Sequence, residues 1–219
     1  NCTTVCAGSA HVYKSSATQD PANTYTWTLS NNTSGASFGS ATNAPTVTVN
    51  AGASGGGYTL NLTVLSAGGT TMCSQAVVVQ PPTAIGNGPS VGTACEGSAG
   101  PVNFSVTAAG SNLHYVWKVN GVTTGTDSAN LAFNPSALAP GSYPVTVDVT
   151  GDCGSASANT TLTINDATEI SDPPDNAEAC DDSHGPVNFS VPATGTGTLH
   201  YAWTVNNVAA GTDSANLSY

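Results

Sequence analysis

Positive charge is almost absent from this 219-residue chain, which has two Lys, no Arg and thirteen acidic residues, for a net charge of −11. Proteins that bind nucleic acids draw much of their affinity from clustered Lys and Arg side chains that face phosphates. Similar basic clusters attract proteins to anionic membrane surfaces. We therefore expect no nucleic-acid partner and no charge-driven membrane contact.

Long apolar runs and helical periodicity are also missing. No stretch approaches the roughly 20 apolar residues of a membrane-spanning helix, so we expect no membrane insertion in this segment. A signal-peptide pattern is absent as well, and we expect the mature or internal part of a longer precursor. No two Cys have the C-x-x-C spacing, which disfavours a zinc site.

A tandem repeat is the clearest positive feature. The stretch from Cys95 to Phe133 recurs from Cys180 to Tyr219, with 25 of 39 positions identical and one inserted residue. The spacing of about 85 residues fits a small domain and is too long for a solenoid unit. Pro81-Pro82 with the Gly-rich stretch to Gly92 is predicted to be one joint, and the proline pair Pro173-Pro174 marks the next. We predict domains at 1–80, 81–166 and 167–219, the last being the N-terminal half of a third unit.

Alternating apolar and polar residues predict β-strands throughout the chain and no helix. The predicted strands are Tyr25–Leu29, Tyr58–Val64, Val102–Val106, Leu113–Val119, Ala129–Phe133, Tyr143–Val149 and Ala156–Ile164. Ser34–Ser40 and Ala51–Gly57 are rich in Gly and Ser and are predicted to be loops. The fold class predicted from these patterns is all-β.

Six Cys favour an oxidising compartment. By the repeat, Cys95 and Cys153 belong to the second unit and Cys6 and Cys73 take the matching places in the first, so we predict one disulfide inside each unit. A bridge that closes a loop of about 60 residues would contribute on the order of 4 kcal/mol. Cys2 is left over, Cys180 would pair beyond residue 219, and the partners of both stay open.

The aromatic residues resemble those of an immunoglobulin-like (Ig-like) sandwich, because Trp27, Trp117 and Trp203 each follow a Tyr by two positions. Further segments resemble the PKD-like and Ig-like repeats of very large secreted surface proteins of gliding and biofilm-forming bacteria; they are Val5–Ser9, Tyr25–Leu29, Ala51–Gly55, Tyr58–Val64 and Cys73–Ser74. The resemblance implies tandem Ig-like (PKD-like) β-sandwich domains at the cell surface. It implies no site, because residues 117–121 depart from the Trp-Asp-Phe-Gly-Asp-Gly signature of PKD domains.

Glycan attachment is the modification that the polar residues suggest. Chance alone would give about five N-x-S/T sequons in this composition, but several lie on strands where alternation turns them outward. The candidate sites are Asn31, Asn32, Asn61, Asn103, Asn159, Asn188 and Asn216. Ser128 and Ser214, each after an Asp, resemble an O-glycosylation acceptor of the same bacterial group, and an Asp-Ser turn before a strand is the equal alternative.

Catalytic and metal-binding arrangements are weaker interpretations. His114, Asp127 and Ser128 have the residue types of a hydrolytic triad, repeated at His200, Asp213 and Ser214, but no nucleophile elbow accompanies them. We therefore expect no enzyme. Seven acidic residues between 166 and 182 could hold Ca²⁺, although their spacing fits no ordered Ca²⁺ loop and a solvated linker is the favoured interpretation.

The sequence thus predicts an extracellular structural protein, a glycosylated stalk or filament segment of a bacterial surface appendage or adhesin. Its partners would be covalent glycans and further units, through self-association or continuation of the chain into a fibre. Two alternatives stay open. One is a carbohydrate- or surface-binding module that uses loops such as Gly121–Thr126 and Asn207–Thr212, and the other is an accessory domain of a larger secreted enzyme.

Overall fold

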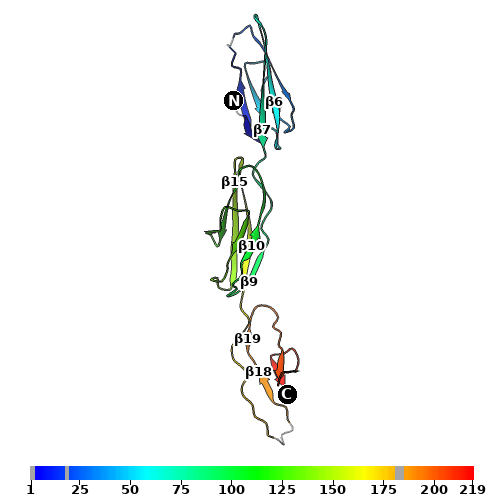
Figure 1. The fold of residues 1–219 in the computed structure, drawn as a ribbon, viewed down its shortest axis with the longest axis vertical. Helices are drawn as coiled ribbons and strands as arrows, with labels where there is room; N and C mark the ends of the chain where they lie inside the picture. Colours follow the sequence, from blue (N-terminus) through cyan, green and yellow to red (C-terminus); the bar gives the residue numbers. More distant parts are fainter. Residues whose placement is uncertain (1–2, 18–19, 181–184) are drawn as a thin grey trace. The chain divides into compact units, whose positions relative to one another are not determined.

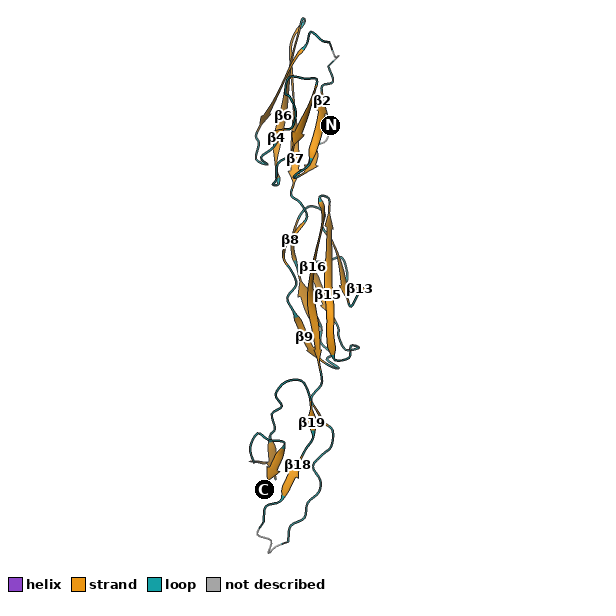
Figure 2. Ribbon diagram, turned by 180° about the vertical axis from the view of Figure 1, so that it is seen from behind, coloured by secondary structure: helices purple, strands orange, loops and turns teal. Residues whose placement is uncertain are grey.

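The computed structural model describes residues 3–17, 20–180 and 185–219. Strands and loops make up all of the described part, and Figure 2 shows no helix there. The predicted all-β fold is therefore confirmed. By their internal contacts the residues form two compact units, namely Asn1–Pro89 with Ser105–Leu131 and Val145–Asn159, and Ser90–Phe104 with Ala132–Pro144 and Thr160–Tyr219.

Strand pairing follows the sequence repeat. Every sheet among the described residues draws its strands from one of three ranges, 4–80, 84–165 or 169–218. We call these the first, second and third strand groups. The domain boundaries at residues 80 and 166 stay a prediction, because the two compact units divide the chain differently.

The first strand group is a two-layer sandwich, drawn in blue to cyan in Figure 1. One sheet has the order β1-β7-β6-β3 and the other the order β2-β5-β4. The strands are β1 (Thr4–Cys6), β2 (Ala10–Lys14), β3 (Thr24–Ser30), β4 (Ser37–Phe38), β5 (Thr46–Asn50), β6 (Gly56–Ser66) and β7 (Gly69–Gln80). The first strand, β1, runs parallel to the last, β7, and Cys6 lies opposite Gln80.

The core of this sandwich comes from the inward residues of the alternating strands. Tyr25 and Trp27 of β3 pack with Tyr58, Leu60 and Leu62 of β6, and all five are buried. The Trp27 indole N–H donates to the Ala44 carbonyl over 2.9 Å, whereas the buried Tyr25 hydroxyl has no hydrogen-bond partner among the described residues. Alternation thus decides which face of each strand enters the core.

The second strand group repeats this plan. Its strands are β8 (Ala84–Asn87), β9 (Gly92–Cys95), β10 (Val102–Ser105), β11 (Thr107–Ala109), β12 (His114–Val119), β13 (Val122–Thr124), β14 (Asn130–Phe133), β15 (Gly141–Gly151) and β16 (Gly154–Asn165). The main sheet has the order β13-β12-β15-β16-β9. Here too the short strand β9 runs parallel to the end of β16, with Cys95 opposite Asn165.

The third strand group has counterparts of only part of the second. Its strands are β17 (Glu169–Ile170), β18 (Asn188–Ser190), β19 (Ala193–Thr194), β20 (Trp203–Val205), β21 (Val208–Ala210) and β22 (Asn216–Ser218). Strand β20 pairs with β21 alone, whereas β12 also pairs with β15. Trp203 is consequently only half-buried, while Trp117 is 1% exposed.

All seven predicted strands are present, with ends that differ by a few residues. Two predicted loops need correction. Ser34–Ser40 contains the short strand β4, and Ala51–Gly57 ends inside β6. The expected joint after Pro82 is also wrong in part, because Ala84–Asn87 forms β8 and pairs with β11.

Candidate functional site

One disulfide is formed among the described residues, and it joins Cys6 to Cys153 with Cα atoms 5.5 Å apart. Cys6 ends β1, and Cys153 lies in the turn between β15 and β16. Both residues belong to the same compact unit. The bond therefore connects the first strand group to the second, across a sequence separation of 147 residues.

The predicted pairing inside each unit is wrong, and the strand register explains why. Cys6 lies opposite Gln80 on β7, and Cys73 precedes Gln80 by seven residues on the same strand, which corresponds to roughly 23 Å. Cys95 lies opposite Asn165, twelve residues or roughly 40 Å along the strand from Cys153. Disulfides need Cα atoms closer than about 7 Å, so the pairs Cys6–Cys73 and Cys95–Cys153 cannot form in this fold.

The turn that carries Cys153 is held by hydrogen bonds to its neighbours. The Asp152 amide donates to the Ser111 carbonyl over 3.0 Å, and the Asn112 side-chain amide donates to the Asp152 carboxylate over 2.7 Å. The Thr83 amide donates to the Cys153 carbonyl over 3.2 Å. These contacts hold the turn that carries Cys153 against Thr83 and the Ser111–Asn112 segment.

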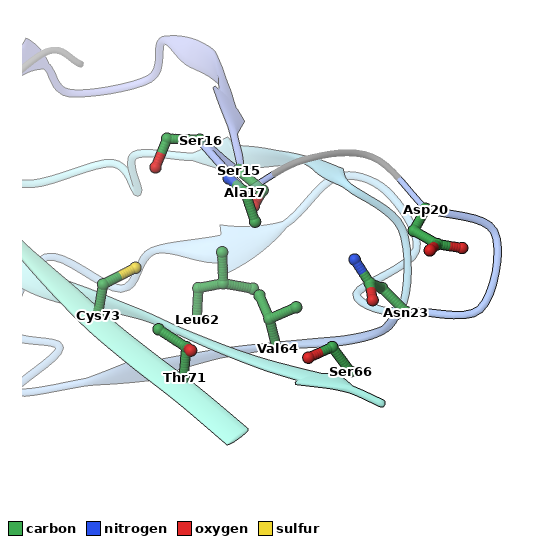
Figure 3. A pocket seen from close by; sticks show the side chains of 10 residues that line it. All are labelled: Ser15, Ser16, Ala17, Asp20, Asn23, Leu62, Val64, Ser66, Thr71 and Cys73. Carbon is green, nitrogen blue, oxygen red and sulfur yellow. The ribbon is translucent and has the colours of Figure 1, made fainter. Parts of the chain in front are cut away.

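Cys73, Cys95 and Cys180 are free thiols and all are exposed. Cys73 stands beside an open hollow of about 400 Å³, whose floor includes Leu62 and Val64 (Figure 3). Ser15 and Asp20 lie on the far side of this hollow. Cys2, whose partner the sequence left open, lies outside the described residues.

The sequons fall into two classes. Asn31, Asn32, Asn103, Asn159, Asn188 and Asn216 are exposed, and Asn61 is half-buried. The amide of Asn32 is engaged, because its Nδ2 donates to the Ala36 carbonyl over 2.7 Å and its Oδ1 accepts from the Ala36 amide over 2.8 Å. Asn61 Nδ2 donates to Ser30 Oγ over 3.0 Å.

Four sequons have side chains that point away from such contacts. In the described part of the chain, no hydrogen bond engages the side chain of Asn103, Asn159, Asn188 or Asn216. Their nitrogens are accessible on outward strand faces, as the alternation predicts. Glycan attachment at any of the seven sequons stays a prediction.

The same His-Asp pair occurs in the second and third strand groups. His114 Nδ1 donates to Asp127 Oδ2 over 2.6 Å, while Asp127 Oδ1 accepts from the Tyr115 amide over 2.7 Å. His200 and Asp213 repeat the pair over 2.5 Å. Each carboxylate thereby fixes the loop before one strand to the start of another.

The Ser beside each Asp has a structural contact of its own. Ser128 Oγ accepts from the Asn130 amide over 3.1 Å, and the Ser128 carbonyl accepts from the Trp117 indole N–H over 2.9 Å. Ser214 makes the corresponding bonds to Asn216 and Trp203. We find no described hydrogen bond from Ser128 Oγ to His114, so the geometry resembles a turn before a strand more than a hydrolytic triad.

Hydrogen bonding stabilises the charged form of three carboxylates. The bonds from His114 and Tyr115 lower the pKa of Asp127 below its ordinary value of 3.8. The His200 and Tyr201 bonds lower the pKa of Asp213 in the same way. Hydrogen bonds from Lys118 and Ser157 lower the pKa of Asp148, and the Lys118 ammonium lies 2.8 Å from the Asp148 carboxylate.

Metal ligands do not gather in the described part of the chain, where no group of three or more His, Cys, Asp or Glu side chains could hold an ion. The acidic stretch suggested for Ca²⁺ is only partly testable, because Asp181 and Asp182 lie outside the described residues. No helix in the described part could cross a bilayer.

The short strand parallel to the last strand, the buried Trp and the paired sheets indicate a known domain type. Residues 93–164 match the PKD domain. Together with the repeat and the strand groups, this match supports an all-β fold of tandem Ig-like, PKD-like units. Such domains are in general non-catalytic modules, and with a disulfide they are typical of extracellular adhesion or structural proteins. No curated protein matches the sequence.

Solved structures of titin domains support the same fold. Two structures of titin domains I67–I69 match with a TM-score of 0.55 and 15% sequence identity, covering 97% of this chain and 79% of the three-domain titin fragment. Sidekick-1 immunoglobulin domains 1–4 match with a TM-score of 0.42 and 16% identity, covering 99% of this chain and 65% of theirs. At these identities the titin match shows an Ig-like fold and nothing of function.

Proposed function

We propose that this chain is a non-enzymatic, extracellular segment of a bacterial surface appendage or adhesin, and that it forms part of a glycosylated stalk or filament. The coarse part of this proposal rests on the PKD and Ig-like domain type. The specific part rests on where the aromatic and polar side chains lie.

The observation that carries the proposal is the inward position of the aromatic rings. Trp27, Tyr58, Phe104 and Trp117 are all at most 6% exposed. The one strongly exposed aromatic residue among the described ones is Tyr219, at 65%. Sugar-binding surfaces usually display several aromatic rings together, so this distribution favours a surface that carries glycans over one that binds them.

Mechanical spacing would be the task of such a segment. Each strand group buries its own apolar residues, and the bond between Cys6 and Cys153 adds a covalent connection. The net charge of −11 keeps neighbouring copies apart except where specific contacts join them. Exposed Asn residues supply attachment points for glycans on the outside.

The test is the intact mass of the protein purified from its source, before and after enzymatic and chemical deglycosylation. We expect excess mass that falls to the peptide mass, and fibres or stalks when the native assembly is imaged. Asn103→Gln and Asn159→Gln should each remove one glycan. Asn32→Gln serves as the matched control, since the Asn32 amide is already bonded within the fold and should carry none.

The outcome that counts against the proposal is a protein of bare peptide mass that occurs as a monomer in its source. Glycans found on Asn32 but absent from Asn103 and Asn159 would contradict the structural part of the argument. If glycans are found but no fibres or stalks are seen, the proposal of a glycosylated surface stands and the proposal of a filament is wrong.

A second candidate function is a binding module for carbohydrate or a host surface. Val122 and Val208 occupy matching positions at the starts of β13 and β21, and each is 69% exposed. Two exposed apolar residues in equivalent hairpins could contact a ligand. Val122→Ser with Val208→Ser should then abolish binding to glycan arrays or cell surfaces, and unchanged binding would remove this candidate.

A further inference from the structure

Cys95 occupies the same structural position as Cys6. Each is the last residue of a short strand that runs parallel to the last strand of its group. Cys6 lies opposite Gln80, and Cys95 lies opposite Asn165. The free thiol of Cys95 is therefore the register equivalent of a cysteine that is bonded in the same chain.

The turns that follow the two cysteines are also built alike. The amide after Cys6 donates to the Gln80 carbonyl over 2.9 Å, and the amide after Cys95 donates to the Asn165 carbonyl over 2.8 Å. Three residues on, the Ser9 amide donates to the Cys6 carbonyl over 3.2 Å, and the Ser98 amide donates to the Cys95 carbonyl over 3.1 Å. The backbone thus follows a similar path around both cysteines.

The pattern extends to a third place in the sequence. Cys180 also has a Ser three residues later, so that Cys-x-x-Ser opens each of the three repeats. By contrast, Cys73 has no counterpart in this pattern. With Gln80 aligned to Asn165, Cys153 corresponds to Gly68 and Cys73 corresponds to Ala158. Cys153 is thus the one described cysteine in a turn between two long strands.

We propose that Cys95 is a disulfide-forming site for another Ig-like unit, whose reacting cysteine lies in the turn between its two longest strands. The Cys6–Cys153 bond would then be one example of a repeated connection, in which the short parallel strand of one unit is bonded to the turn between the two longest strands of another. This inference concerns the chemistry between units and does not depend on glycans or on the filament.

The bond forms by thiol–disulfide exchange with a disulfide oxidant such as glutathione disulfide. The Cys95 thiolate attacks one sulfur of the oxidant and releases a glutathione thiolate, which leaves a mixed disulfide. The thiolate of the partner cysteine then attacks the Cys95 sulfur and displaces the second glutathione. The two protein thiols lose two electrons and two protons, and the oxidant leaves as two glutathione thiols. Exposure of Cys95 makes its sulfur accessible to the oxidant.

The test completes the third strand group with the chain's own sequence. Phe133 aligns with Tyr219 in the repeat, so a second copy of residues 134–165 is fused after Tyr219 and supplies a turn cysteine. The matched control carries Ser at that copied cysteine. Both proteins are oxidised in a glutathione buffer, alkylated with iodoacetamide and mapped by peptic digestion and mass spectrometry.

We expect the alkylation of Cys95 to fall at least about tenfold in the fusion and to stay complete in the control, with Cys73 alkylated in both. Acrylamide quenching checks folding, because Trp27 and Trp117 are buried and half-buried Trp203 should become protected in the fusion. Protected Trp203 with fully alkylated Cys95 overturns the proposal.

A second variant is needed in case the fused segment does not fold and Trp203 gains no protection. It also tests whether the partner cysteine can come from another copy of the chain. Cys6→Ser frees the Cys153 thiol in the unextended chain, and Cys95 of a second copy should bond to it. A covalent dimer that Cys95→Ser removes and Cys73→Ser does not remove supports the proposal. If Trp203 gains no protection in the fusion, full alkylation of Cys95 in both the fusion and the Cys6→Ser variant overturns the proposal.

Discussion

Removal of the bond between the two strand groups should lower the stability of the chain measurably. The double substitution Cys6→Ser with Cys153→Ser replaces both sulfurs by hydroxyls of similar shape. Cys6 and Cys153 are only partly buried, so the loss of packing is small. The main effect should therefore be the loss of the covalent constraint on the unfolded chain.

The size of that constraint follows from the separation of 147 residues. The chain-entropy relation for a loop of this length gives roughly 5 kcal/mol at 25 °C. That figure is an upper limit, because it treats the looped chain as one cooperative unit and two strand groups can unfold in separate steps. We expect a loss of about 2–4 kcal/mol, the usual range for a native disulfide.

Guanidinium unfolding followed by Trp fluorescence measures this loss. The matched control is Cys73→Ser, which removes an exposed free thiol and should change the unfolding free energy by less than about 0.5 kcal/mol. The reasoning fails if Cys73→Ser costs as much as the double substitution, or if reducing agent leaves the oxidised wild-type curve unchanged.

Three further predictions concern single residues. Gly92→Ala would place a Cβ 2.7 Å from Phe104 Cζ and 2.8 Å from Val102 Cγ1. The substitution should therefore lower the free energy of unfolding, measured by chemical denaturation, by about 1–3 kcal/mol. Gly100→Ala is the control, because Gly100 has open space around it, and it should change this free energy little. The pKa of Asp127 is lowered in the fold, so its contribution to the stability of the fold is present at pH values above its ordinary pKa and is lost as the pH falls through the folded pKa. The Tm difference between wild type and Asp127→Asn should therefore shrink in acid. A Tm difference that stays constant in acid would contradict this reasoning. Asn32→Ala should cost about 1–2 kcal/mol through its two bonds to Ala36, and an equal cost for Asn103→Ala would show that those bonds contribute nothing.

The strands were predictable because their signal is local. In Tyr25–Leu29 and Tyr58–Val64 the residues that alternate in the sequence are those that alternate between core and surface in β3 and β6. Short pieces were missed. Ser37–Phe38 and Ala84–Asn87 are too short and too rich in Gly or Ser to show a period, and they are strands only because β5 and β11 pair with them.

The disulfide was not predictable from the assumption that every unit closes its own bond. Membership of a repeat says nothing about distance along a strand, and Cys6 is separated from Cys73 by the length of seven residues of β7. A signal was present in the spacing, because the repeat aligns Tyr58 with Tyr143 and therefore Cys73 with Ala158 instead of Cys153. Cys73 and Cys153 therefore do not occupy equivalent positions in the two repeats.

The bond between Cys6 and Cys153 also changes how the chain would respond to tension. A pull on the two ends would pass through the sulfur atoms, and the residues between the two cysteines would be shielded from it. Fully extended, a segment with this separation of 147 residues would measure roughly 500 Å. Reduction of this one disulfide would make that length available for extension. The redox state of the surroundings would therefore set the maximum length to which the chain can be extended.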